Sequence, residues 1–314
     1  MLNYTIRLTG VRTIDGRLPG RVLGDVVQML ADGTAGALLL RSEGRSVRSD
    51  RLANWVERGT DFTVIEQLTG SEPGVRIATQ RLGDALPERF EQVDMFPQLA
   101  RSESALSIFL SSLSDAAGER DDSDAFDAEL LRVYNRVFSR LFTRDRVREV
   151  VIHNGIPDAI PARYTAGILK SFSALRERTP EPRRVRLAGR MDEARYSRSS
   201  FVLDLADATR TRCVLLDARQ NELKEHFGES VVVEGLAQFR PSGRLLRIDV
   251  ERISRSGEAD RQVFSKEPVA LDARLDLKVV DRLRAKSKGV SSLIGQWPGE
   301  ETDEEIAALI SELS

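Results

Sequence analysis

The sequence contains only one cysteine and two histidines among its 314 residues. A lone cysteine excludes a disulfide within the chain, and so few thiol and imidazole groups leave little room for zinc, a Ser-His-Asp triad or a Cys-His pair. Cys213 lies in an apolar run and is expected to be a small buried side chain. We therefore expect a protein that is not an enzyme and that needs no cofactor or metal.

Aromatic residues are also scarce, at 6% of the chain, and the net charge is only −2 because 47 basic residues nearly balance 49 acidic ones. This balance produces no overall field that would favour nucleic acid, an anionic membrane or an acidic substrate. The first residues lack the apolar segment of a secretory signal, and no apolar run approaches the roughly 18 residues that cross a bilayer. We expect a soluble, cytoplasmic protein without a membrane partner.

Residues 1–178 have the pattern of an α+β domain. Alternating or continuous apolar runs predict strands at residues 4–8, 61–68, 75–79 and 147–152. Pro19 opens a helical run with a broad apolar face, and Gly33 and Gly36 are expected to interrupt it. No motif in this domain indicates what it does.

The middle of the chain is rich in helical patterns. Helices are predicted at residues 105–113, 126–141 and 164–175, with Asp124 as the N-cap of the second helix and Asp127 in its first turn. The preceding acidic segment, residues 121–124, hints at calcium chelation but lacks the glycine and distal glutamate of an EF-hand, so a solvated linker is expected. Pro180 and Pro182 cannot continue a helix and mark a domain boundary.

Residues 184–254 have a different texture, with short alternating segments. Five strands are predicted, at residues 185–191, 200–205, 212–216, 230–237 and 245–250, with a short helix at 221–227. Five strands with a helix between the third and the fourth form the element order of an OB-fold barrel. The segments Val185-x-Leu187-x-Gly189-Arg190 and Val231-Val232-Val233-x-Gly235 also resemble the first and fourth strands of OB-fold nucleic-acid-binding domains.

This resemblance implies a candidate nucleic-acid surface. Residues 183–255 hold 15 cations against 11 carboxylates, and Arg240, Arg244 and Arg247 flank the turn between the fourth and fifth strands. Such turns often contact single strands in OB-folds. Phe201, Phe239 and Tyr196 are the stacking candidates, although Phe201 lies in an apolar strand typical of a core. A barrel with a purely structural or protein-binding role is the alternative.

The C-terminal part combines a predicted basic helix, residues 271–288, with an acidic tail, residues 289–314. From Gly299 onward the tail has six carboxylates and no cation. Trp297 and Pro298 form a rigid apolar group of the kind that dominates interface energies, and Thr302 with Glu305 forms a capping box. Ile306, Leu309 and Ile310 then share one face of a short helix. Such a helix is marginal alone and is expected to fold on a partner, although packing on its own domain is the alternative.

The tail resembles the toxin-binding segment of VapBC-type antitoxins, which commonly reads Gly-x-Trp-Pro-Gly-Asp-Glu-Thr-Asp-Glu-Glu-Ile. Residues 295–306 match this pattern with Glu300 in place of the aspartate. The resemblance implies that the tail binds a small toxin encoded next door, a PIN-type ribonuclease, and that a nearby cation enters its Mg²⁺ site. Arg284, Lys286 and Lys288 are the candidates, unless they only form a solvated basic helix face.

Two functions are therefore weighed. The first is a non-catalytic, antitoxin-like partner protein that neutralises a toxin through its tail. The second is an OB-fold nucleic-acid-binding subunit of a larger repair, defence or regulatory complex. Antitoxins of this family usually carry a ribbon-helix-helix or swapped-hairpin DNA-binding domain, and this sequence has no pattern for one.

Overall fold

A computed structural model describes residues 1–47, 52–90, 99–154, 160–195, 200–215 and 220–270 of the chain, and the statements below concern these residues. In chain order the elements are β1 (Leu2–Thr9), α1 (Gly20–Glu43), α2 (Asn54–Thr60), β2 (Phe62–Leu68), β3 (Gly74–Thr79), α3 (Leu82–Ala85), the 3₁₀ turn η1 (Pro87–Arg89), α4 (Ala105–Ala117), α5 (Ala128–Ser139), the π turn η2 (Arg140–Arg144), β4 (Glu149–His153), β5 (Ala162–Thr165), α6 (Ile168–Arg178), β6 (Arg183–Arg195), β7 (Ser200–Asp204), β8 (Arg210–Leu215), α7 (Gln220–His226), β9 (Ser230–Phe239), β10 (Leu245–Arg255) and α8 (Glu258–Val263).

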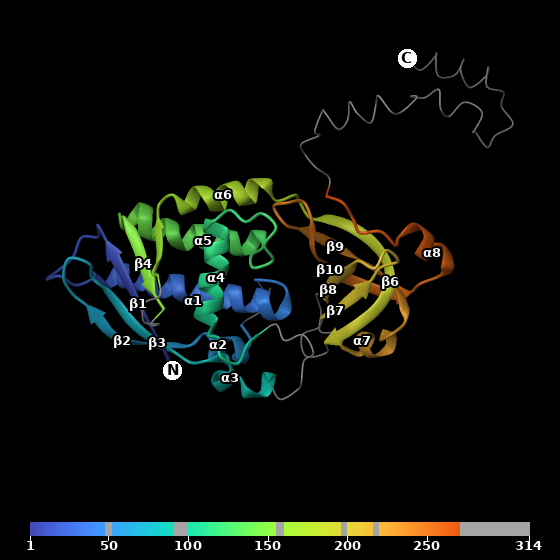
Figure 1. The fold of residues 1–314 in the computed structure, drawn as a ribbon, viewed down its shortest axis with the longest axis horizontal. Coiled ribbons are helices and arrows are strands. Elements are labelled where there is room, and N and C mark those ends of the chain that lie inside the picture. The colour runs from blue at the N-terminus through green and yellow to red at the C-terminus, as the bar shows by residue number, and fades with distance from the viewer. Residues whose placement is uncertain (48–51, 91–98, 155–159, 196–199, 216–219, 271–314) are drawn as a thin grey trace, which may run out of the picture. The chain divides into compact units, whose positions relative to one another are not determined.

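The N-terminal elements form a sheet covered by helices. The strand order is β2-β3-β1-β4-β5, and every neighbouring pair is antiparallel. One face of this sheet shares a hydrophobic core with α1, α4, α5 and α6, which pack against one another (Figure 1). The side chains alternate as a half-buried sheet requires: Tyr4, Ile6 and Leu8 of β1 are buried in this core.

The second group of strands closes into a barrel. Its order is β10-β8-β7-β6-β9, with β6 and β9 antiparallel and β8 and β10 parallel, and α7 lies between β8 and β9 in the chain. The barrel has its own hydrophobic core. The predicted α+β class and the OB-like five-stranded barrel are thus confirmed. Gly235 of β9 pairs with Val250 of β10. A Cβ on Gly235 would stand 2.2 Å from the Asp249 carbonyl oxygen, so the close approach of the two strands requires glycine.

Residues 1–270 form one unit, and residues 271–314 form the second. The first unit therefore contains both the sheet with its helices and the barrel, each with a core of its own. The predicted helix at 271–288 and the predicted tail at 289–314 lie outside the described residues.

Three local predictions are wrong. Gly33 and Gly36 do not interrupt α1, because both glycines lie in tight helix contacts rather than at a break. The N-cap of α5 is Asp127 rather than Asp124, since its side chain accepts the Leu130 N–H at 2.9 Å. The chain around Tyr164 is a strand, β5, and the helix begins only at Ile168.

Because α1 is uninterrupted, it is also long and apolar enough to cross a membrane by length and composition. The sequence analysis expected no apolar run of this length, so it did not predict that α1 would meet this criterion. Of its most apolar window, 67% is buried inside the protein, as expected for a core helix.

Candidate functional site

An open cleft of about 850 Å³ lies beside the junction of the helices and the barrel. Its walls come from the first turn of α5, the end of α6, the proline linker that follows and the strands β9 and β10. Its charged lining residues are Arg45, Asp127, Glu129, Arg132, Arg176, Glu177, Glu181, Arg247 and Asp249. Four arginines and five carboxylates line the cleft, so its charge does not favour either an anionic or a cationic ligand. The Arg45 Nε is buried there without a hydrogen-bond partner.

A buried ion-pair network forms one wall of this cleft. The Arg247 side chain, only 7% exposed, donates from Nη1 to Asp127 at 3.1 Å and from Nε to Asp249 at 2.8 Å. Asp249 also accepts from the Gln238 amide at 2.9 Å, and Asp127 accepts from the Ser46 hydroxyl at 2.5 Å. Burial acts to lower the pKa of Arg247, but the charges of Asp127 and Asp249 outweigh it, so the pKa is raised. The network joins β10 to the start of α5.

A second set of contacts connects the acidic loop, residues 121–124, to the β9–β10 turn, residues 240–244. Asp122 accepts from the Arg240 Nη1 at 3.2 Å, from the Ser242 hydroxyl at 3.0 Å and from the Arg244 Nη1 at 2.8 Å. The Ser242 N–H donates to the Asp121 carbonyl at 3.0 Å. Burial acts to raise the pKa of Asp122, but the Ser242 hydrogen bond and the two arginine charges lower it overall. The turn thus surrounds one carboxylate with three side-chain donors.

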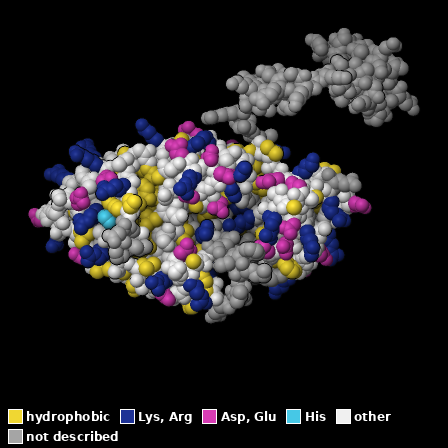
Figure 2. Space-filling model, in the orientation of Figure 1, with side chains coloured by type: hydrophobic (Ala, Val, Ile, Leu, Met, Phe, Trp, Pro, Cys, Tyr) yellow, Lys and Arg dark blue, Asp and Glu magenta, His cyan; other side chains and the backbone are white. Residues whose placement is uncertain are grey.

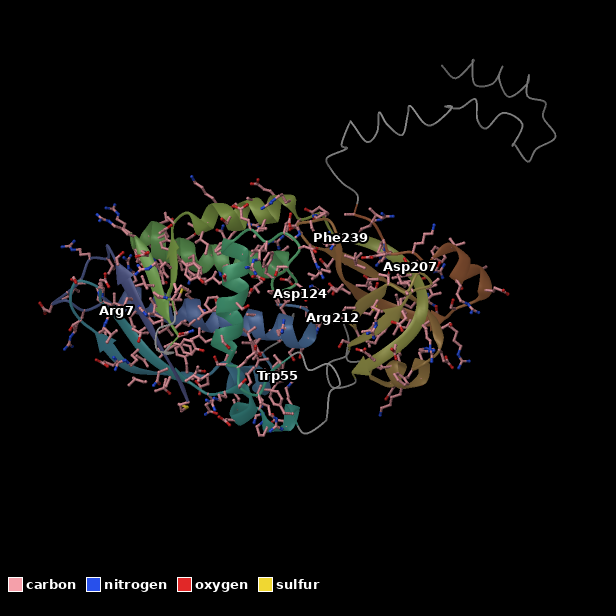
Figure 3. The ribbon with its side chains drawn as sticks, viewed as in Figure 1. Arg7, Trp55, Asp124, Asp207, Arg212 and Phe239 are labelled. Carbon is pink, nitrogen blue, oxygen red and sulfur yellow. The ribbon has the colours of Figure 1, made fainter. Side chains whose placement is uncertain are left out.

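A smaller cavity of about 220 Å³ lies next to these contacts. Its polar lining residues are Arg210, Thr211 and Arg212 of β8, Arg240, and the two carboxylates Asp124 and Glu267. Figure 3 shows Asp124 from the helical part and Arg212 from the barrel beside each other at this junction. Two buried polar atoms of its lining residues, the Arg240 Nε and the Thr211 Oγ1, have no hydrogen-bond partner.

These contacts change the interpretation of the predicted nucleic-acid residues. Arg240 and Arg244 lie in the turn as predicted, but both bind Asp122. Arg247 belongs to the buried network, which corrects its assignment as a contact for nucleic acid. Phe201 and Phe239 are 1% and 3% exposed in the barrel core, so neither offers a stacking face, and Tyr196 lies outside the described residues.

The predicted partner-binding residues are not among those that the structure describes. They are Arg284, Lys286, Lys288, Trp297, Pro298, Ile306, Leu309 and Ile310, all in residues 271–314.

Sequence reasoning missed the acceptors Asp122, Asp127 and Asp249. The acidic loop is exposed at residues 121, 122 and 124, as a solvated linker would be, but the prediction did not include the pairing of Asp122 with the β9–β10 turn. Its partners Arg240 and Arg244 lie 118 and 122 residues further along the chain. Only the opposite charges of the loop and the turn could have suggested this pairing.

The described residues also include one cysteine and a histidine on α7. They contain no group of three or more His, Cys, Asp or Glu side chains that could hold a metal ion. Cys213 is buried in the barrel core as predicted, and burial raises the pKa of its thiol far above the ordinary value. The His226 side chain of α7 is 15% exposed, and its Nδ1 lies 3.4 Å from Glu229, whose pKa is lowered by that contact and by Arg255.

Charge over the visible surface is mixed. Basic and acidic side chains are interspersed on the face that Figure 2 shows. Comparison with family models, with curated proteins and with solved structures finds no match to this chain.

Proposed function

We propose that this protein is a non-catalytic, antitoxin-like partner protein that binds and neutralises a small toxin through residues 289–314. The observation that carries the proposal is the agreement of residues 295–306 with the toxin-binding pattern of VapBC-type antitoxins. The division of the chain supports it, because the tail belongs to the short second unit, residues 271–314, and not to the unit that holds both hydrophobic cores.

The chemistry expected of the tail suits a PIN-type ribonuclease. An aromatic group such as Trp297, followed by Pro298, supplies a large rigid apolar contact. The apolar positions Ile306, Leu309 and Ile310 would extend that contact along a helix formed on binding. A cation from Arg284, Lys286 or Lys288 would compete with Mg²⁺ for the carboxylates of the toxin's active site.

Co-expression with the product of the neighbouring reading frame tests this proposal. The full chain should co-purify with that product and suppress its toxicity, whereas a chain ending at Gly289 should do neither. Trp297→Ala should weaken binding by at least tenfold, as expected for a central aromatic anchor. The matched control is Gln296→Ala, since Gln296 occupies the variable position of the pattern. Equal binding by the full chain and the shortened chain would refute the role of the tail.

A second candidate function, binding of single-stranded nucleic acid by the barrel, is supported by one observation. The β9–β10 turn, at the place where OB-folds often contact single strands, gathers three donors around one anionic group. Because Phe201 and Phe239 are buried, such binding would rest on phosphate contacts more than on base stacking.

Salt dependence tests the second candidate. Binding of a labelled oligo-dT should weaken steeply with salt, and Arg240→Ala combined with Arg244→Ala should abolish most of it. Arg190→Ala combined with Arg252→Ala removes the same charge from exposed positions on β6 and β10 and serves as the control. If the two double variants bind equally, the β9–β10 turn is not the site.

A further inference from the structure

Asp122 occupies the β9–β10 turn in the way a bound anion would. Its two carboxylate oxygens are shared among three side chains of the turn: Oδ1 accepts from Ser242 and Arg240, and Oδ2 accepts from Arg244. Two anionic oxygens held by a hydroxyl and two guanidinium groups form the arrangement that also binds the non-bridging oxygens of a phosphodiester.

The neighbouring cavity has unused capacity for such an anion. Among the described residues, Arg240 Nε and Thr211 Oγ1 are buried without a hydrogen-bond partner, and both residues line the cavity of about 220 Å³. Arg210 and Arg212 line it as well, and Arg210 is paired with Glu193 and Asp204. A buried donor without an acceptor is costly, which favours a ligand that supplies oxygen atoms there. The cavity lining also includes two carboxylates, Asp124 of the acidic loop and Glu267.

We infer that the acidic loop, residues 121–124, is an internal competitor that occupies the phosphate-binding surface of the barrel, and that single-stranded nucleic acid binds there by displacing Asp122. The inference rests on the second candidate function given above. Nucleic acid is favoured over an acidic protein because the surface belongs to the strand and turn that OB-folds use for oligonucleotides.

The exchange is feasible because Asp122 and Arg244 are exposed and Arg240 is only partly buried, at 25% exposed. The side chains of Asp122 and Arg244 are 43% and 73% exposed, and ion pairs at such positions are weak and screened by salt. The buried pair of Arg247 and Asp127 holds β10 to α5 independently of the acidic loop. Displacing Asp122 therefore leaves the connection between barrel and helices intact.

The decisive experiment compares Asp122→Ala with Asp121→Ala in the full chain, using fluorescence anisotropy of labelled oligo-dT. The two variants lose the same charge at adjacent positions. In the described part of the chain the Asp121 side chain has no hydrogen bond or ion pair, and only its carbonyl contacts the turn. Asp122→Ala should tighten binding by about three- to tenfold at low salt, because it removes the competing carboxylate from Arg240 and Arg244 while keeping the bond from the Arg240 Nη1 to the Asp122 carbonyl at 2.9 Å. Asp121→Ala should change it less than about twofold.

The salt slope supplies a second readout that mere loosening of the loop would not move. For Asp122→Ala, the slope of log K against log salt should be steeper than for the unaltered protein, because in the unaltered protein salt also weakens the competing pairs of Asp122 with Arg240 and Arg244 and so partly offsets the loss of phosphate contacts. Adding Arg240→Gln and Arg244→Gln to Asp122→Ala should remove both the gain in affinity and the change in slope.

Each outcome has a distinct meaning. If the unaltered protein and both alanine variants bind with the same affinity and slope, the competitor role is overturned while nucleic-acid binding stands. If none of them binds at low ionic strength, both the inference and the second candidate function fail. If Asp122→Ala binds a polyglutamate peptide as tightly as the oligonucleotide at equal salt, the surface is a general polyanion site and the assignment to nucleic acid is overturned.

Discussion

Two glycines in the second half of α1 lie where even a methyl group would collide with a neighbouring helix. A Cβ on Gly33 would stand 2.5 Å from the Phe109 ring of α4, and one on Gly36 would stand 2.6 Å from the Leu130 side chain of α5. Phe109 and Leu130 are fully buried, and Phe109 packs edge-on against Tyr134, so the ring has no room to retreat. Glycine allows the three helices to approach one another closely.

Gly33→Ala should therefore destabilise the protein even though alanine is the better helix former. We expect a loss of about 1–2 kcal/mol in the free energy of unfolding, because the overpacking cost exceeds the gain in helix propensity. Gly24, in the same helix, has open space around it. Gly24→Ala should accordingly stabilise by about 0.5–1 kcal/mol. Urea denaturation measures both, and a Gly33→Ala variant as stable as Gly24→Ala would contradict the packing argument.

At the scale of elements, β10 connects the barrel to the helical part of the unit through Arg247. This arginine lies between a carboxylate of its own strand, Asp249, and the N-cap of α5, Asp127. Asp127 also binds the Ser46 hydroxyl and backbone N–H, so one carboxylate joins the loop after α1, the start of α5 and the barrel. A buried charge with this many partners is costly to remove because its partners remain buried.

Arg247→Ala should lower the free energy of unfolding by about 3–5 kcal/mol, since it leaves two carboxylates buried without their cation. Arg252 lies on the same strand but is exposed, so Arg252→Ala should change stability by less than about 0.5 kcal/mol. Thermal and urea unfolding followed by circular dichroism give both values. A small effect of Arg247→Ala would mean that the network does not stabilise the junction.

At the scale of the whole molecule, the described part of the first unit contains two large hydrophobic cores and a small third cluster, and the largest core buries three tyrosines. Burial raises the pKa of Tyr164 to about 12, and it raises the pKa values of Tyr4 and Tyr134 as well. The Tyr134 hydroxyl donates to Ser112 at 2.8 Å, and the Tyr4 hydroxyl lies 2.9 Å from the Ser104 hydroxyl. The folded protein therefore holds these phenols neutral, whereas the unfolded chain ionises them near pH 10.

This difference predicts alkaline unfolding. A pKa raised by folding contributes stability that is fully present below about pH 10 and is lost as the pH rises through the folded value of about 12 for Tyr164. Absorbance of tyrosinate at increasing pH should show these three of the four tyrosines ionising together with the loss of circular dichroism. Ionisation of three tyrosines near pH 10 with the fold unchanged would contradict the assigned burial.

Local pattern accounts for much of this fold. The alternation in residues 230–237 predicts a strand because side chains on successive residues face opposite sides of a sheet, and β9 follows it with one face in the barrel core. The order of five strands and one helix likewise predicts an OB-like barrel without any information on how the strands pair. The stripe of apolar residues in α5 predicted a helix packed on one side.

Long-range pairing had no such local signal. An ion pair between Asp122 and Arg244 depends on two loops meeting across 122 residues of chain, and neither loop differs in sequence from a solvated one. From sequence alone Gly33 is expected to break a helix, but in the structure it allows Phe109 to pack closely against α1. Phe239 is a stacking candidate by sequence, but in the structure it is buried in the barrel core. Periodicity therefore determines which segments become strands and helices. Closure of the barrel and its packing against the helical part determine which charged side chains meet, because these contacts join residues that are far apart in the sequence.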